Sequence, residues 1–439
     1  MNLFDLSLKF SGFPIEKAET ALQNIQQIKN NDYQAYVNEK KQNIVEFHLK
    51  HTPFYNALAK NADPNNWNTI PVMTKADLQQ PLNERLAEGF NHKNVYVNKT
   101  SGSSGTPFIF AKDKFCHALT WALIKNRFGW YGLDFNKSKQ ARFYGIPLDK
   151  IGYFKERLKD FLSNRYRFSV FDLSEEALAD CLEKFKTVHF DYMNGYTSSM
   201  VQFAKFLQKK NMQLKLVCPS LKVCIVTSEM LFEDDKSFLE FQFGIPVVNE
   251  YGASELDVIA FQNPKNAWQV NSETLYVEIL DEKNNVLPYG EEGRIVITSL
   301  YNKAHPFIRY DIGDIGILSK QSTLKKPILE KLIGRTNDIA ILPSGKKAAG
   351  LTFYYITKRI IEDDGNVKEF IIEQHKKDTF IVKYISKEVL SDLKIKLISE
   401  EMERYLEKGL HIQFKRLDTF QRSKSGKLKQ FTSLIKEVE

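Results

Sequence analysis

The chain is poor in cysteine, in glycine and proline, and in long apolar runs. Its 439 residues hold 4 Cys, 21 Gly and 14 Pro, against 32 Phe and 19 Tyr. The cysteines form no CxxC pair and no disulfide-framework spacing, which excludes a disulfide-stapled scaffold and indicates a reducing compartment. No apolar run reaches about 18 residues, and the N-terminus lacks the apolar segment of a secretion signal. We therefore expect a cytoplasmic protein without a membrane span.

The excess of charge of one sign is also small. The 62 basic and 54 acidic residues leave a net charge of +8 that is spread along the whole chain. No basic cluster with interleaved aromatics occurs, so no nucleic-acid partner is expected. The mild positive balance suits a protein that handles anionic small molecules. With 43% hydrophobic residues, the chain can form two or three well-packed domains.

Strand-like and helix-like segments alternate in the middle of the chain. Short strands are predicted at 188–195 and 246–252 and a fully apolar strand at 221–228, with helices at 197–210 and 233–243 between them. Strands separated by helices of this length predict a parallel sheet with helices on its faces.

The pattern of predicted elements changes after residue 270. Residues 274–300 read as two β-rich runs joined by turn residues, 368–386 as a hairpin, and 388–409 as an amphipathic helix that ends at Gly409. The predicted fold is therefore α/β. A large N-terminal domain, residues 1–333, has mixed sheets flanked by helices plus a β-rich subdomain, and residues 334–439 form a small α+β domain.

The nine residues from Thr100 to Phe108, "TSGSSGTPF", are almost free of large side chains. Backbone N–H groups and hydroxyls in such a loop can converge on phosphate oxygens. The segment is not the phosphate-binding loop of nucleotide triphosphatases, because no Lys follows Gly105. A linker or a tight turn fits the composition equally well.

Four further segments carry residue types suited to nucleotide chemistry. In "NEYGASEL" (249–256), Tyr251 can stack on a purine and Glu255 can hold Mg²⁺, although a strand-to-helix turn capped by Ser254 is the ordinary reading. In "RYDIGDIG" (309–316), Asp314 can accept ribose hydroxyls, or simply close a turn. "IGRTNDIAI" offers Arg335 and Asp338 at a domain joint, and "RSKSGKLKQF" offers Lys427 in what is otherwise a basic tail.

Taken in order, these segments resemble the motif series of the adenylate-forming superfamily, which includes acyl-CoA synthetases and the adenylation domains of peptide synthetases. Within it the chain is most similar to the phenylacetate–CoA ligases and the related capsular-polysaccharide-type proteins. The resemblance runs from "IPVMTKADL" through "FGIPVVNEYGASE" and "KAHPFIRYDIGD" to the C-terminal tail, which is nearly the whole chain.

The resemblance implies an enzyme that joins ATP and a carboxylic acid into an acyl-adenylate, and then passes the acyl group to a thiol, usually that of CoA. It implies that Glu255 coordinates Mg²⁺ and that Lys427 bridges the carboxylate and the α-phosphate. Asp314 would bind the ribose, Arg335 would contact the nucleotide, and Asp338 would be the hinge of a mobile C-terminal domain. The implied ATP-binding set is completed by the loop and the turn: Ser101, Gly102, Ser103, Ser104, Gly105, Thr106, Tyr251, Gly252 and Ser254.

Two departures from the family leave the second half of the reaction open. Thr106 and Phe108 stand where relatives carry a lysine, so positive charge must come from Mg²⁺ and Lys427. The segment "LPSGKK" (342–347) differs from the aryl-CoA ligase pattern on the side that faces the acceptor. The alternatives are transfer to an amine of a sugar or polysaccharide precursor, and a non-catalytic nucleotide-binding relative. The charged set of Glu255, Asp314, Arg335 and Lys427 weighs against the last. A homodimer is left open.

Overall fold

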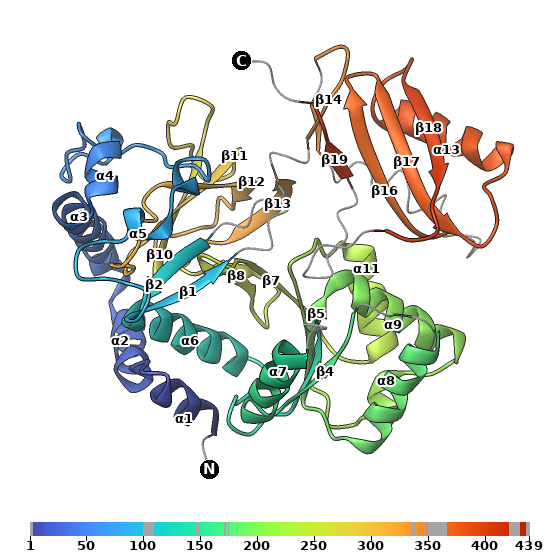
Figure 1. The fold of residues 1–439 in the computed structure, drawn as a ribbon, viewed down its shortest axis with the longest axis horizontal. Coiled ribbons are helices and arrows are strands. Elements are labelled where there is room, and N and C mark those ends of the chain that lie inside the picture. The colour runs from blue at the N-terminus through green and yellow to red at the C-terminus, as the bar shows by residue number, and fades with distance from the viewer. Residues whose placement is uncertain are drawn as a thin grey trace. The chain divides into compact units, whose positions relative to one another are not determined.

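The structure, a computed structural model, describes residues 3–99, 109–145, 150–170, 173, 175–335, 339–345, 347–349, 367–420 and 431–435 (Figure 1). The chain divides into two compact units. One consists of Met1–Ile312 with Ile317–Glu330, and the other of Gly313–Gly316 with Lys331–Glu439. That the second unit is a mobile domain carrying the catalytic lysine stays a prediction.

A seven-stranded sheet organises the first unit, with the strand order β4-β3-β5-β6-β7-β8-β9. The first five strands of this order are parallel, as predicted for the segments around 188–252, whereas β8 and β9 are antiparallel. The strands are β3 (Gln140–Phe143), β4 (Arg165–Phe168), β5 (Tyr192–Tyr196), β6 (Val223–Thr227), β7 (Val247–Ala253), β8 (Asp257–Gln262) and β9 (Trp268–Val270).

Helices cover both faces of this sheet, and the composition of β6 shows why. All five residues of β6 are buried, and successive side chains point to opposite faces. Val223 and Ile225 join a core with α1 (Leu3–Phe10), α2 (Ile15–Gln27) and α6 (Lys114–Gly129). Cys224 and Val226 join a core with α8 (Glu175–Thr187), α9 (Thr197–Lys209) and α11 (Glu233–Phe243). A strand buried on both faces reads as a continuous apolar run, which is how this segment was predicted.

The helices of the first unit carry these apolar faces. They are α1 (Leu3–Phe10), α2 (Ile15–Gln27), α3 (Tyr33–His51), α4 (Pro53–Leu58), α5 (Leu82–Arg85), α6 (Lys114–Gly129), α7 (Lys150–Leu162), α8 (Glu175–Thr187), α9 (Thr197–Lys209), α10 (Leu214–Val217) and α11 (Glu233–Phe243). Among the described residues, no helix has both the length and the apolar character needed to cross a bilayer.

Smaller sheets complete the first unit. Strands β1 (Val95–Lys99) and β2 (Ile109–Asp113) pair antiparallel, and neither was predicted. Strands β10 (Leu275–Leu280) and β11 (Glu292–Ser299) form the predicted antiparallel pair. Their sheet continues with β12 (Tyr310–Leu318) and β13 (Leu329–Arg335), the strands in which the chain passes between the two units.

The second unit is a small α+β domain. Its main sheet has the order β18-β17-β16-β19, formed by β16 (Val367–Lys376), β17 (Thr379–Ser386), β18 (His411–Arg416) and β19 (Phe431–Ser433). The pair β16–β17 is the predicted hairpin. Helix α13 (Asp392–Tyr405) is capped by Ser391. The short strands β14 (Ile339–Ile341) and β15 (Lys347–Ala349) pair antiparallel with each other.

Candidate active site

The carboxyl ends of β5, β6 and β7 meet at one edge of the seven-stranded sheet. Tyr196 and Thr227 end β5 and β6, and Glu250 is the last residue of β7 that pairs with β6; the three lie side by side in the strand register. In parallel α/β sheets this edge is where ligands bind, because the strand ends and the following turns leave a crevice there. The predicted adenine- and metal-binding segment, 249–256, covers the end of β7 and the turn that leads to β8.

The turn after β7 requires glycine at position 252. A Cβ on Gly252 would lie 2.4 Å from the backbone carbonyl oxygen of Asp257, and the β7–β8 ladder has a bulge between Tyr251 and Gly252. Backbone atoms cannot give way at that distance. After this turn the chain continues into β8, which pairs antiparallel with β7, so the alternative of a strand-to-helix turn capped by Ser254 is wrong.

Glu255 meets a residue of the third motif. The hydroxyl of Tyr310, at the start of β12, donates a hydrogen bond of 3.1 Å to Oε1 of Glu255, and both side chains are buried. The structure thus brings together "NEYGASEL" and "RYDIGDIG", which are far apart in the sequence. One carboxylate is the usual protein ligand of a Mg²⁺ that also binds substrate phosphates, so Glu255 fits the predicted metal.

Tyr251 is less open than a purine-stacking residue would need to be. Its side chain is 7% exposed, and its ring lies edge-to-face with Trp268 at 6.0 Å between centroids. A role beside adenine stays a prediction for this tyrosine.

A buried ion pair between β2 and the start of β8 holds the β7–β8 turn in position. Nζ of Lys112, in β2, pairs with Oδ2 of Asp257 and donates a longer bond of 3.4 Å to the carbonyl of Ser254. The same Asp257 oxygen accepts a 2.8 Å bond from Thr120 of α6. Lys112 therefore connects the strand that follows the predicted phosphate loop to the turn that carries Glu255.

The predicted phosphate loop joins β1 to β2. Lys99 and Ile109 are the last paired residues of this hairpin, so the loop starts and ends at neighbouring backbone positions. Arg85, which is buried, donates a 2.9 Å bond to the carbonyl of Ile109 and fixes one stem. The predicted residues Ser101, Gly102, Ser103, Ser104, Gly105 and Thr106 lie outside the described part of the chain.

Glu250 is a half-buried acid that was not predicted as a site residue. Burial raises its pKa from 4.5 to about 7, while a hydrogen bond with Thr227 and the positive charge of Arg142 act in the opposite direction. Arg142 lies over the ring of Tyr144 at 3.9 Å, and that ring lies 4.7 Å from Tyr196. A charged residue inside the apolar segment "PVVNEYG" was the signal in the sequence.

The remaining predicted residues belong to the second unit. Asp314 is buried in β12, directly after Gly313, whose φ of 82° is one that glycine favours. Arg335 is the last residue of β13, and its side chain lies outside the described part, as do Asp338 and Lys427. Their roles, and that of Asp314 at the ribose, stay predictions.

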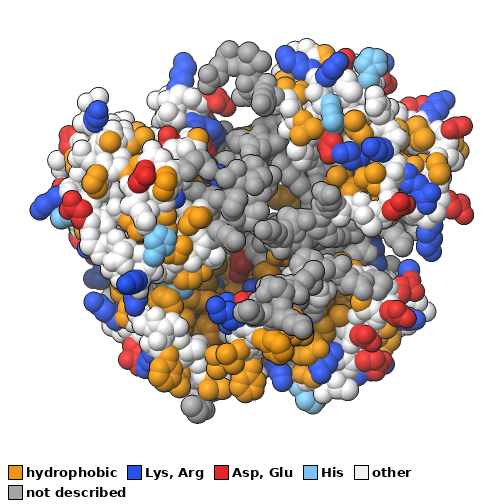
Figure 2. Space-filling model, viewed as in Figure 1, with side chains coloured by type: hydrophobic (Ala, Val, Ile, Leu, Met, Phe, Trp, Pro, Cys, Tyr) orange, Lys and Arg blue, Asp and Glu red, His pale blue; other side chains and the backbone are white. Residues whose placement is uncertain are grey.

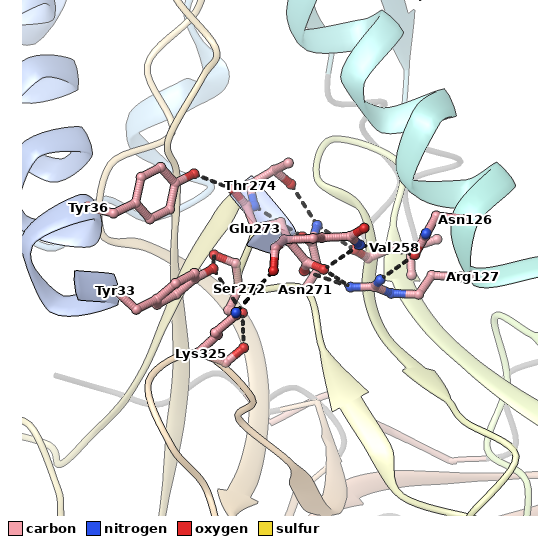
Figure 3. A network of polar contacts seen from close by, with 11 residues as sticks. Tyr33, Tyr36, Asn126, Arg127, Val258, Asn271, Ser272, Glu273, Thr274 and Lys325 are labelled. Atoms are coloured by element: carbon pink, nitrogen blue, oxygen red, sulfur yellow. Dashed lines mark hydrogen bonds and ion pairs between the residues drawn. The ribbon is translucent and has the colours of Figure 1, made fainter. Parts of the chain in front are cut away.

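A second polar network lies beside the start of β8, where the Asn271 side-chain amide donates a 3.2 Å bond to the carbonyl of Val258 (Figure 3). The Glu273 carboxylate accepts bonds of 2.7 and 2.6 Å from Arg127, and the Tyr36 hydroxyl donates to the Glu273 carbonyl at 2.7 Å. These contacts join α3 and α6 to the turn before β10. A cavity of about 580 Å³ beside them is lined by Trp130 and Lys265, among others. None of the predicted site residues whose side chains the structure describes lines it, and we interpret the network as structural.

Comparison with known proteins identifies proteins of similar sequence. No protein-family model matches it. It is 23% identical to protein CapK of Staphylococcus aureus over 81% of this chain and 77% of CapK. It is 31% identical to the phenylacetate–coenzyme A ligase of Aromatoleum evansii, over 28% of this chain and only 29% of that ligase.

Solved structures show the fold. A structure of 2-hydroxyisobutyryl-CoA ligase in the postadenylation state matches 94% of this chain and 91% of its own, with a TM-score of 0.70 at 15% identity. The amide bond synthetase McbA from Marinactinospora thermotolerans matches 77% and 69%, with a TM-score of 0.53 at 16% identity. The fold is that of the AMP-forming ligases, as the motifs predicted. By sequence the chain is similar to CapK and, over a shorter stretch, to a phenylacetate–coenzyme A ligase, and its fold matches that of the solved ligases.

Proposed function

We propose that the chain is an ATP-dependent acid ligase that activates a carboxylic acid as an acyl-adenylate and then transfers the acyl group to the thiol of CoA. The observation that carries this proposal is the contact between Glu255 and Tyr310 at the carboxyl edge of the parallel sheet. It joins two of the five motifs in a fold that matches a CoA ligase over nearly its whole length. ATP and CoA as substrates also support a cytoplasmic location.

The first step has an electrostatic problem that the proposed residues address. A carboxylate oxygen must attack the α-phosphorus of a triphosphate, and both reactants are anions. Mg²⁺ held by Glu255 would supply positive charge at the phosphates, and Lys427 would supply it between the carboxylate and the α-phosphate. The loop 100–108 would hold the outgoing pyrophosphate through amides and hydroxyls, and Asp314 and Arg335 would hold the nucleoside part.

The second step needs a different arrangement of the same chain. Lys427 lies about 170 residues after Glu255, in the unit that we propose to be a mobile domain turning at Asp338. A lysine on such a domain can approach for adenylation and withdraw before the acceptor enters.

Acid-dependent exchange of labelled pyrophosphate into ATP tests the proposal. We expect exchange with at least one member of a panel of aryl and alkyl acids, and a loss of about 100-fold or more in Lys427→Ala, because one preorganised charge at the reacting phosphate is typically worth that much. The matched control is Lys424→Ala, which removes a neighbouring charge of the same segment. Absence of exchange across the panel would support the non-catalytic alternative instead.

An amine acceptor is the second candidate function. It is favoured by the similarity to an amide bond synthetase and by the segment 342–347, which differs from the aryl-CoA ligase pattern. Consumption of free CoA thiol after adenylation supports the thioester, whereas adenylate formation without thiol consumption supports the amine.

A further inference from the structure

Helix α7 is oriented with its acidic side chains inward and its aromatic side chains outward. Among its described side chains, Asp160 is 3% exposed, whereas Phe154 is 71%, Leu158 59% and Phe161 72% exposed. A helix that crosses between two parallel strands ordinarily buries its apolar stripe on the sheet. In Figure 2 hydrophobic side chains gather over α7, in the lower centre of the view.

Ion pairs to β4 hold the helix in this orientation. Asp160 bonds to Arg165 at 2.5 Å and to Arg167 at 2.9 Å, and Glu156 bonds to Arg167 at 2.7 Å. Glu156 and Asp160 are one helical turn apart, so both face the strand. Turning the helix to bury its aromatic side chains would leave two largely buried arginines without their carboxylates, which is strongly unfavourable.

The outward face has the chemistry of an interfacial helix. Phe154, Leu158 and Phe161 have the spacing i, i+4, i+7 and form one stripe. Lys155 and Lys159 lie beside the stripe and are exposed, and Lys159 also pairs with Glu156 at 2.6 Å. Glu156 and Asp160 are both neutralised by these ion pairs, so among the described side chains of α7 the charge left near the stripe is positive.

We propose that this face of α7 docks the protein on an anionic membrane surface. Apolar side chains with flanking lysines are the pattern of helices that lie in the headgroup region, where the aromatic rings enter the acyl boundary and the lysines meet lipid phosphates and carboxylates. Charge complementarity favours this occupant over a second copy of the chain. A two-fold pairing of α7 would bring the same lysines of both copies together.

Vesicle co-sedimentation of the full chain tests the proposal. We expect binding to phosphatidylcholine vesicles that contain about 30% phosphatidylserine, weaker binding as salt rises, and little binding to phosphatidylcholine alone. Phe154→Ser/Phe161→Ser and, separately, Lys155→Gln/Lys159→Gln should each lower the partition coefficient about tenfold or more. The control Phe241→Ser removes a side chain on α11 that is 75% exposed, and should leave binding unchanged.

Other outcomes would overturn the proposal. Wild-type protein that stays in the supernatant with anionic vesicles would contradict it. A second contradicting result is a wild-type dimer in light scattering that binds no lipid and that Phe154→Ser/Phe161→Ser converts to a monomer. A third is vesicle binding that Phe241→Ser lowers as much as Phe154→Ser/Phe161→Ser does. Unchanged melting temperatures of the variants show that they fold, since all the changed side chains are exposed.

Discussion

At the scale of single residues, the chemistry of Glu250 is set by its position where β7 separates from its parallel partner β6. Burial penalises the charged form of its carboxyl, and the Thr227 hydrogen bond and the Arg142 charge recover only part of that penalty. The pKa therefore lies near 7 rather than 4.5. In the folded protein the carboxyl keeps its proton over a pH range in which it would be ionised in the unfolded chain.

This difference predicts a pH-dependent stability that Glu250→Gln removes. The stabilisation is fully present below pH 4.5, where the unfolded chain is also protonated, and is lost as pH rises through 7. A raised pKa of this size corresponds to about 3 kcal/mol over that window. We therefore expect the melting temperature of Glu250→Gln, relative to wild type, to increase between pH 5 and pH 8. A difference that is constant across this range would contradict the pKa assignment.

Residue types in short segments were enough to predict the candidate site, but not the contacts within it. Glu255 was predicted from its place in "YGASE", whereas its partner Tyr310 lies 55 residues further on and depends on tertiary packing. Lys112 was missed, although it follows three apolar residues in "IFAKD". In the structure Lys112 is buried, and only Ile109 of this strand is exposed. A burial pattern shows that a charge needs a partner, but not which partner it has.

At the scale of elements, the Lys112–Asp257 pair connects β2 to the β7–β8 turn. Both charges are at least three-quarters withdrawn from water, with side-chain exposures of 3% and 23%. Removing one partner leaves the other charge unpaired in a poorly solvated place.

We expect Lys112→Met to destabilise the protein by about 3 kcal/mol and to raise the KM for ATP more than that for the acid, because the pair holds the Glu255 turn against the stem of the phosphate loop. A double-mutant cycle with Asp257→Asn checks this, since the second change should cost little once the first is made. Additive destabilisation, or equal effects on both KM values, would contradict the role as a brace.

Helices α11 and α7 show which elements the sequence could predict. For α11, the acidic first turn and Gly244, with a φ of 69° at its end, mark both boundaries, and the predicted range 233–243 is the observed one. Helix α7 has no counterpart among the predicted elements. Its apolar residues lie on the outside, so its orientation depends on Arg165 and Arg167 of a strand that follows it.

At the scale of the whole molecule, the order of motifs along the chain was more informative than any one of them. Each segment alone had an ordinary reading as a turn, joint or tail, yet the series predicted a fold that matches a solved ligase at 15% identity. The acid and the acceptor could not be predicted, because pocket specificity depends on side chains that come together only in the folded protein.

The central claim is that the edge carrying Glu255 and Tyr310 is an adenylation centre that uses Mg²⁺. The most direct measurement is acid-dependent pyrophosphate exchange as a function of Mg²⁺ concentration, for wild type and Glu255→Gln, with Glu229→Gln as a control at the same sheet edge. The proposal predicts that Glu255→Gln alone requires about tenfold or more Mg²⁺ for half-maximal exchange, since it loses a charged ligand of the metal. Exchange by Glu255→Gln with the wild-type Mg²⁺ dependence would contradict it.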